Sequence, residues 1–205
     1  MLLFFHELVL PFIVISLLSI SVITVINIDF FLLGNNLSEQ SITELSQLLL
    51  LLSSTVIFIR EAIIDQGKRT LYTLVAGFFS CMFLRELDYY FDMIVHGFWF
   101  YPTILLAASV IIYSIKNIDN LANSFRCFSQ TQAYFNILIG LVIIMIFSRL
   151  FGSSVLWREI MNDDYKHVYK TIIQEGLELF GYILIFIGSL SQYKFSKNSQ
   201  NYCST

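Results

Sequence analysis

The chain has 205 residues, of which 57% are hydrophobic and 13% charged, and its formal net charge is −3. The charged fraction is about half that of an ordinary soluble domain, so a soluble globular protein is excluded. The long runs of Phe, Leu and Ile indicate a protein that lies in the lipid bilayer, and we expect no nucleic-acid partner.

The apolar runs, taken in chain order, predict an all-α polytopic integral membrane protein with a bundle of about six transmembrane helices. Each run is close to the roughly 20 residues that cross the hydrocarbon core, where a helix satisfies its own backbone hydrogen bonds. No repeat or linker interrupts the pattern, so residues 1–205 are expected to form a single transmembrane domain. The predicted spans are residues 8–26, 45–63, 71–89, 98–115, 134–150 and 175–193.

The charges of the connections predict the orientation of these spans. The first connection contains three acids and no base, whereas the second contains Arg60, Lys68 and Arg69. If successive connections alternate between the two sides of the membrane, one side carries seven bases and four acids, a net charge of 7 − 4 = +3. The other side then carries five bases and eleven acids, a net charge of 5 − 11 = −6. Lys and Arg accumulate on the cytoplasmic side, so both termini are expected to be cytoplasmic, in a plasma or inner membrane. The chain begins without the basic region of a secretory signal, and the first span is therefore expected to remain as an anchor.

Six charged residues at the ends of three predicted spans are expected to lie in one layer of the bilayer. A rise of 1.5 Å per residue places them between about 22 and 28 Å across a core about 30 Å thick. A charge that faces hydrocarbon costs at least about 2.5 kcal/mol, so such residues usually pair or line a cavity. The layer consists of Arg85, Glu86 and Asp88 from the third span, Arg149 from the fifth, and Glu175 and Glu178 from the sixth.

The charges of this layer do not balance. Arg85 and Arg149 act as internal counter-ions for four acids, which leaves a formal charge of 2 − 4 = −2. Either some acids are protonated or a cation joins them. At 100° per residue, Tyr182 falls within about 60° of Glu175 and Glu178 on the same helix face. The expected lining of a ligand or cation site is therefore Glu86, Asp88, Glu175, Glu178 and Tyr182.

This layer favours a non-enzymatic binding or accessory component of the membrane. Its ligand would be a cation, a lipid headgroup or a partner helix, and the partner would be a second copy of the chain or another membrane protein. The simplest competing interpretation is an ion-paired girdle that only fixes the register of the helices.

The principal alternative is a metal-dependent membrane-embedded enzyme that acts on a lipid-like substrate, so enzymatic activity is left open. Asp92 and His96 are four residues apart, and Glu175 and Glu178 are three apart, so side chains from two helices are candidate ligands of a divalent metal ion. A small transporter or proton-relay protein is the third hypothesis, although the sequence lacks the repeats typical of transporters.

The connection between the fifth and sixth predicted spans, residues 155–171, mixes apolar and charged residues. This composition predicts a short amphipathic helix that lies at the membrane interface, with a simple connector as the alternative. The three cysteines, Cys81, Cys127 and Cys203, lack the spacing of a disulfide framework or metal knuckle and are expected to be unpaired thiols.

Overall fold

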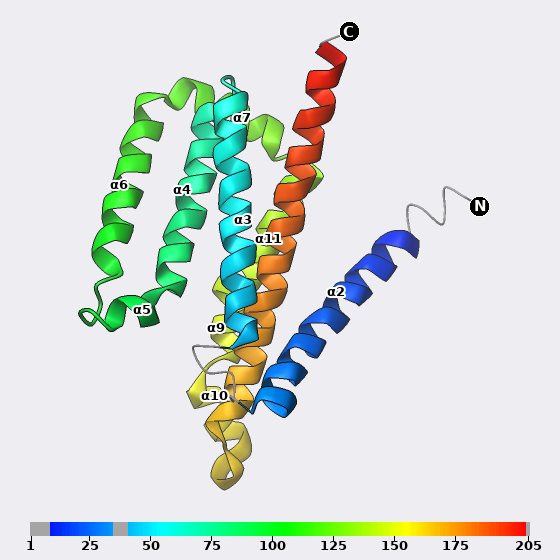
Figure 1. Cartoon of the computed structure of the whole chain (residues 1–205), viewed down its shortest axis with the longest axis vertical. Coiled ribbons are helices and arrows are strands. Elements are labelled where there is room, and N and C mark those ends of the chain that lie inside the picture. The colour runs from blue at the N-terminus through cyan, green and yellow to red at the C-terminus, as the bar shows by residue number, and fades with distance from the viewer. Residues whose placement is uncertain (1–8, 35–40, 204–205) are drawn as a thin grey trace. The chain divides into compact units, whose positions relative to one another are not determined.

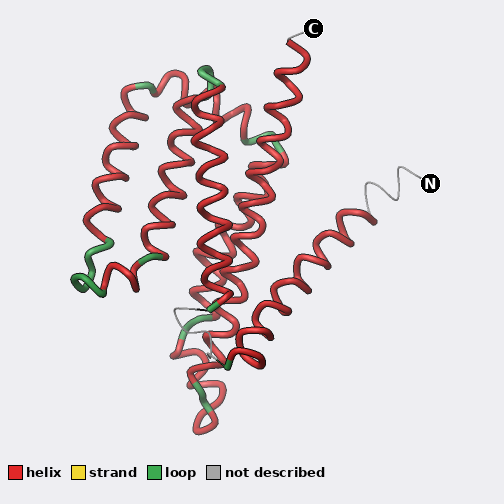
Figure 2. Tube along the Cα trace, viewed as in Figure 1, coloured by secondary structure: helices red, strands yellow, loops and turns green. Residues whose placement is uncertain are grey.

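Helices are the regular elements of this protein (Figure 1). The computed structural model describes residues 9–34 and 41–203, and neither range contains a β-strand. Figure 2 shows helix along nearly the whole described trace, with only short connecting loops. The elements are α2 (Leu10–Asn27), η2 (Ile28–Leu33), α3 (Ile42–Ile64), α4 (Arg69–Glu86), α5 (Asp88–Asp92), α6 (Phe100–Lys116), α7 (Ile118–Phe128), α8 (Gln132–Val142), η3 (Ile143–Phe147), α9 (Ser148–Phe151), α10 (Ser154–Met161), η4 (Asn162–Asp164) and α11 (His167–Cys203).

Four helical stretches of the described chain are long and apolar enough to cross a membrane. They are Phe12–Leu33, Ile42–Ile64, Gln132–Phe151 and His167–Ser196. A fifth is added if α6 and the segment Leu121–Phe128, which meet at a bend of 103°, are counted together as one span. The structure therefore agrees with an all-α, multi-pass membrane protein, but it supports four or five candidate spans and does not confirm six.

The third predicted span is not among these candidates. The corresponding helix, α4, has 18 residues, and three of them, Arg69, Arg85 and Glu86, are charged. These charges lower the hydropathy of a helix that is only just long enough to cross the core. The helix also ends at Glu86, three residues earlier than predicted, and a break at Leu87 separates it from α5.

Two of the apolar stretches contain a segment of wider, π-helical turns. The π-helix η2 continues α2, and η3 continues α8. A π-helical turn shifts the face on which later side chains lie, and such turns are often found at functional sites. The segment η3 runs directly into α9, which carries Ser148 and Arg149.

The chain divides into two compact units. The first contains the residues up to Gln47 together with Gly140–Ile183, and the second contains Leu48–Ile139 and the residues from Leu184 onward. In the first unit, two glycines of α11 permit close helix packing. A Cβ atom at Gly176 would lie 2.9 Å from Ile26 of α2, and one at Gly181 would lie 2.4 Å from Ile144 of η3.

An aromatic cluster forms the core of the second unit. Phe58 of α3, which is fully buried, lies with its ring centroid 5.9 Å from that of Tyr72, 5.7 Å from that of Phe79 and 6.2 Å from that of Phe128. These contacts join α3 to α4 and α7. A Cβ atom at Gly77 would lie 2.6 Å from Val110, so the glycine allows α4 to approach α6 closely.

A buried carboxylate joins η2 to the start of α3. The Asp29 side chain is fully buried and accepts hydrogen bonds from the backbone N–H groups of Ile42, at 2.9 Å, and Thr43, at 2.8 Å, and from the Thr43 hydroxyl. These are N–H groups of the first turn of α3, which have no partner within the helix. Asp29 is one of the three acids that were predicted to lie in the first connection, and the structure instead places it in η2, where its side chain helps Ser41 to cap the first turn of α3.

Candidate functional site

A group of polar side chains surrounds the acidic face of α11 in the first unit. Glu175, Glu178 and Tyr182 lie on this face, and Glu178 and Tyr182 are buried, with 3% and 0% of their surface exposed. The residues that contact the two glutamates come from α3, α9 and α11 itself. We refer to the whole group as the Glu175–Glu178 cluster; it consists of Gln47, Ser148, Arg149, Gln174, Glu175 and Glu178.

The Glu178 carboxylate accepts hydrogen bonds from two neutral groups. Its Oε1 atom accepts from the Ser148 hydroxyl at 3.0 Å and the Gln174 amide at 3.3 Å. The Arg149 guanidinium lies 3.6 Å from the same oxygen, and its side chain is 49% exposed, compared with 4% for Glu178. A long ion pair with one partly hydrated partner contributes little to stability.

Ser148 has a single hydroxyl hydrogen and two acceptors. The fully buried hydroxyl lies within hydrogen-bonding distance of the Ile144 carbonyl as well as of Glu178. When Glu178 is ionised, Ser148 donates its hydrogen to the carboxylate. When Glu178 is protonated, the carboxylic acid donates to the Ser148 oxygen, and Ser148 donates to Ile144. The arrangement therefore accommodates Glu178 with or without a proton.

The side-chain amide of Gln47, on the neighbouring helix α3, holds Glu175 in place. The Gln47 Nε2 atom of α3 lies 3.0 Å from the Glu175 carboxylate and 3.3 Å from its backbone carbonyl oxygen, and Gln47 is 2% exposed. A buried amide that donates to both oxygens fixes the rotamer of Glu175. Gln47 was not among the predicted site residues, although a polar amide near the start of the second predicted span, residues 45–63, is a signal in the sequence from which it could have been found.

A glycine at the end of α9 leaves room for the Gln174 side chain. A Cβ atom at Gly152 would lie only 2.4 Å from the Oε1 atom of Gln174 and 2.7 Å from the Ser148 carbonyl oxygen. The absence of a side chain at Gly152 therefore lets Gln174 occupy the position from which it donates to Glu178.

The three charged residues predicted at the end of the third span belong to the second unit. Arg85 and Glu86 pair with each other as neighbours in the last turn of α4. Asp88 is exposed at the start of α5, where its carboxylate accepts a hydrogen bond from the Tyr89 N–H at 2.7 Å. Because the Glu175–Glu178 cluster lies in the first unit, a layer shared by all six charged residues remains a prediction.

Asp92 and His96, the predicted metal ligands, stabilise a turn after α5. One Asp92 oxygen lies 2.8 Å from the His96 Nδ1 atom, and the other accepts a hydrogen bond from the Gly97 N–H at 2.7 Å. The His96 side chain is 96% exposed. Within the described ranges, no group of three or more His, Cys, Asp and Glu side chains is arranged to hold a metal ion. The metal hypothesis therefore has no geometric support there.

The connection before α11 contains a short helix, as the sequence indicated. This helix is α10, and the Trp157 indole N–H that it carries donates to the Phe151 carbonyl at 2.6 Å. Arg158 lies over the ring of Tyr165, 5.5 Å from its centroid. The Trp157 hydrogen bond folds the connection onto the end of α9, and the Arg158 contact lies within the connection. The place of the connection at the membrane interface stays a prediction.

Comparison with protein-family models, curated proteins and solved structures found no match for this chain.

Proposed function

We propose that this multi-pass membrane protein is a non-enzymatic binding component that takes up a small cation at the Glu175–Glu178 cluster, the proton being the simplest such cation. The contact between Glu178 and Ser148 carries the proposal, because it provides a hydrogen-bond partner for the carboxyl group in both of its protonation states.

The charge of the cluster also supports a cationic ligand. Its acidic face carries two carboxylates, Glu175 and Glu178. Carboxylate oxygens bind a proton or a cation, whereas they repel an anionic ligand.

The position of Glu178 along α11 is consistent with a binding site near one end of a membrane span. The candidate span runs from His167 to Ser196, so Glu178 lies 11 residues from one end and 18 residues from the other. At 1.5 Å per residue, these separations are about 17 and 27 Å. This position suits a site that opens toward one side of the membrane better than a complete pathway across it. We assign that side to the exterior, with both termini cytoplasmic in a plasma or inner membrane, on the basis of the predicted charge asymmetry.

Infrared difference spectroscopy on the reconstituted protein tests this proposal. A pH titration of wild type is expected to show a carboxyl C=O band that is lost in Glu178→Gln. The matched control is Glu159→Gln, because Glu159 is an exposed acid of α10 in the same unit. A parallel titration with Na⁺ at constant pH distinguishes a metal cation from a proton. If Glu178→Gln leaves both titrations unchanged, the cluster has a purely structural role and the proposal is wrong.

A further inference from the structure

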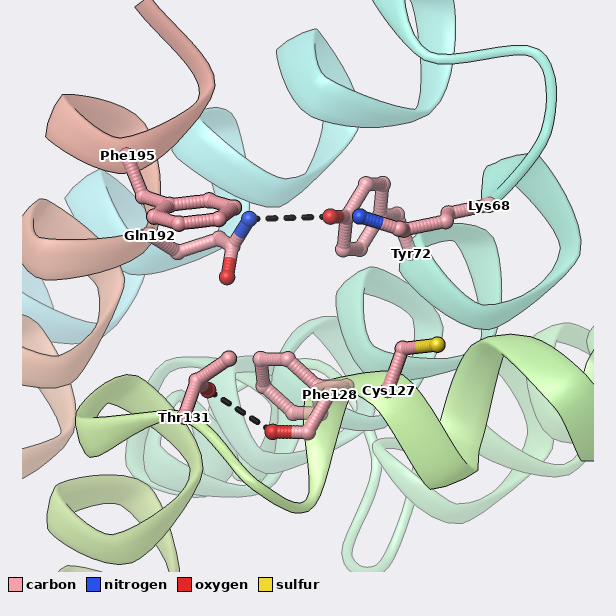
Figure 3. Close-up of a pocket in the computed structure, with 7 residues that line it drawn as sticks. All are labelled: Lys68, Tyr72, Cys127, Phe128, Thr131, Gln192 and Phe195. Carbon is pink, nitrogen blue, oxygen red and sulfur yellow. Dashed lines mark hydrogen bonds between the residues drawn. The ribbon is translucent and has the colours of Figure 1, made fainter. Parts of the chain in front are cut away.

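The second unit contains a small cavity that the function proposed above does not use (Figure 3). Its volume is about 90 Å³, equal to roughly three water molecules at 30 Å³ each. The cavity lies between the start of α4, the end of α7 and the C-terminal part of α11. Its lining residues are Lys68, Tyr72, Cys127, Phe128, Thr131, Gln192 and Phe195.

Polar groups are held in fixed positions on one side of this cavity. The Gln192 Nε2 atom donates to the Tyr72 hydroxyl oxygen at 2.9 Å, and both residues are buried, at 3% and 1% exposure. Since this bond uses Tyr72 as an acceptor, the Tyr72 O–H remains a donor. Figure 3 shows the Lys68 side chain directed toward this hydrogen bond. A hydroxyl donor and a lysine therefore both belong to the wall of the cavity.

Aromatic rings and a thiol form the rest of the wall. Phe128 is buried, whereas Phe195 is 55% exposed and Cys127 is exposed. A ligand with a polar group beside Tyr72 and an apolar part along Phe195 would therefore match both kinds of surface. Cys127 provides a reactive group at which occupancy of the cavity can be measured.

Lys68 is the one charged residue among those that line the cavity. Two acids of the preceding stretch are each close to a base: Glu61 pairs with Arg60 at 2.6 Å, and Asp65 lies 3.8 Å from the Lys68 ammonium. The contact with Asp65 is long and leaves Lys68 able to bind a second anion.

We propose that this cavity binds a phosphate group, with Lys68 as the charged ligand and the Tyr72 hydroxyl as the neutral donor. The volume accommodates one tetrahedral oxyanion but not a whole lipid headgroup, so a lipid would place only its phosphate inside and extend its remainder past Phe195. Basic pockets between membrane helices bind anionic headgroups in this way. The phosphate of an anionic lipid and free inorganic phosphate share this chemistry, and the experiment separates them.

The test measures the rate at which a maleimide labels Cys127 in a Cys81→Ala/Cys203→Ala background. The protein is placed in phosphatidylcholine nanodiscs alone, with added phosphatidylglycerol, or with added inorganic phosphate. At a ligand concentration ten times the dissociation constant, the rate is expected to fall about tenfold, because only the unoccupied fraction reacts. Slowing by phosphatidylglycerol identifies a lipid as the source, and slowing by inorganic phosphate identifies a soluble anion.

Lys68→Gln is expected to abolish this protection. Lys194→Gln is the matched control, since it removes an equal charge from α11 within two residues of Gln192 at a residue that does not line the cavity. Tyr72→Phe removes only the hydroxyl and is expected to weaken protection. It also deprives the buried Gln192 amide of its acceptor and is expected to lower the thermal midpoint, so labelling is compared at a temperature at which circular dichroism shows both proteins folded, which separates binding from folding. Equal loss of protection in Lys68→Gln and Lys194→Gln, or no protection in either ligand arm, would overturn the proposal.

Discussion

The hydrogen bond between Ser148 and Glu178 can be measured by a double-mutant cycle that combines Ser148→Ala with Glu178→Met. The bond is 3.0 Å long and buried, and its acceptor is a carboxylate. Hydrogen bonds to charged groups contribute about 1.5 to 3 kcal/mol in soluble proteins, whereas interhelical bonds in membranes average about 0.6 and reach about 1.7 kcal/mol. We therefore expect a coupling free energy of about 1 kcal/mol between the two sites.

The assay is equilibrium unfolding of the wild type, both single variants and the double variant in mixed detergent micelles. Ser189→Ala, combined with Glu178→Met, is the control cycle. Ser189 is also fully buried on α11, but its hydroxyl donates to the Ile185 carbonyl in the preceding turn. A coupling energy below about 0.3 kcal/mol for Ser148 and Glu178 would refute the reasoning, because distant and independent sites are additive within that range.

Three further predictions follow from the described contacts. Gly152→Ala introduces a Cβ atom 2.4 Å from Gln174, so it is expected to destabilise the protein by about 1 to 3 kcal/mol in thermal unfolding, and an unchanged midpoint would contradict this packing. Asp29→Ala removes part of the cap of α3 and is expected to cost about 1 to 2 kcal/mol in the same assay, whereas Asp29→Asn, which keeps one oxygen acceptor, should cost less. If α4 crosses the membrane, single cysteines that replace Gln66 and Val95, on either side of α4, are expected to react with an impermeant thiol reagent from opposite sides of the membrane. Reaction from one side only would show that α4 does not cross.

The number of spans determines whether the two termini lie on the same side of the membrane or on opposite sides. Four or six crossings place both ends of the chain on the same side, as the charge asymmetry predicts, whereas five crossings place them on opposite sides. The number depends on α4 and α6: neither crosses if there are four spans, α6 together with Leu121–Phe128 crosses if there are five, and α4 crosses as well if there are six. Apolar run length predicted the helices themselves because burial in lipid needs a long apolar segment. Run length did not predict how many of these helices cross the membrane, because α4 combines an apolar middle with the charged residues Arg69, Arg85 and Glu86.

Helical periodicity was enough to place Glu175, Glu178 and Tyr182 on one face of α11, since the angle between residues of a helix is fixed. The neutral side chains around them were not predicted as a group. Gln47 lies 128 residues from Glu175 in the sequence, and Ser148 lies 30 residues from Glu178. A side-chain hydroxyl or amide in an apolar helix often forms a hydrogen bond with the backbone of the same helix. The sequence alone therefore does not indicate which acid of another helix it contacts.

Among the described helices, α11 has a length that the bilayer cannot contain. Its 37 residues extend over about 55 Å at 1.5 Å per residue, whereas the hydrocarbon core is about 30 Å thick. Even a tilt of 40°, at the upper end of the usual range, accommodates only about 39 Å within the core. At least about 16 Å of α11, or some three helical turns, must therefore extend into the headgroup region or the water beyond it. This part of α11, at one end of the crossing or divided between its two ends, lies outside the hydrocarbon core, and a tag or an antibody epitope can be attached there without entering the lipid.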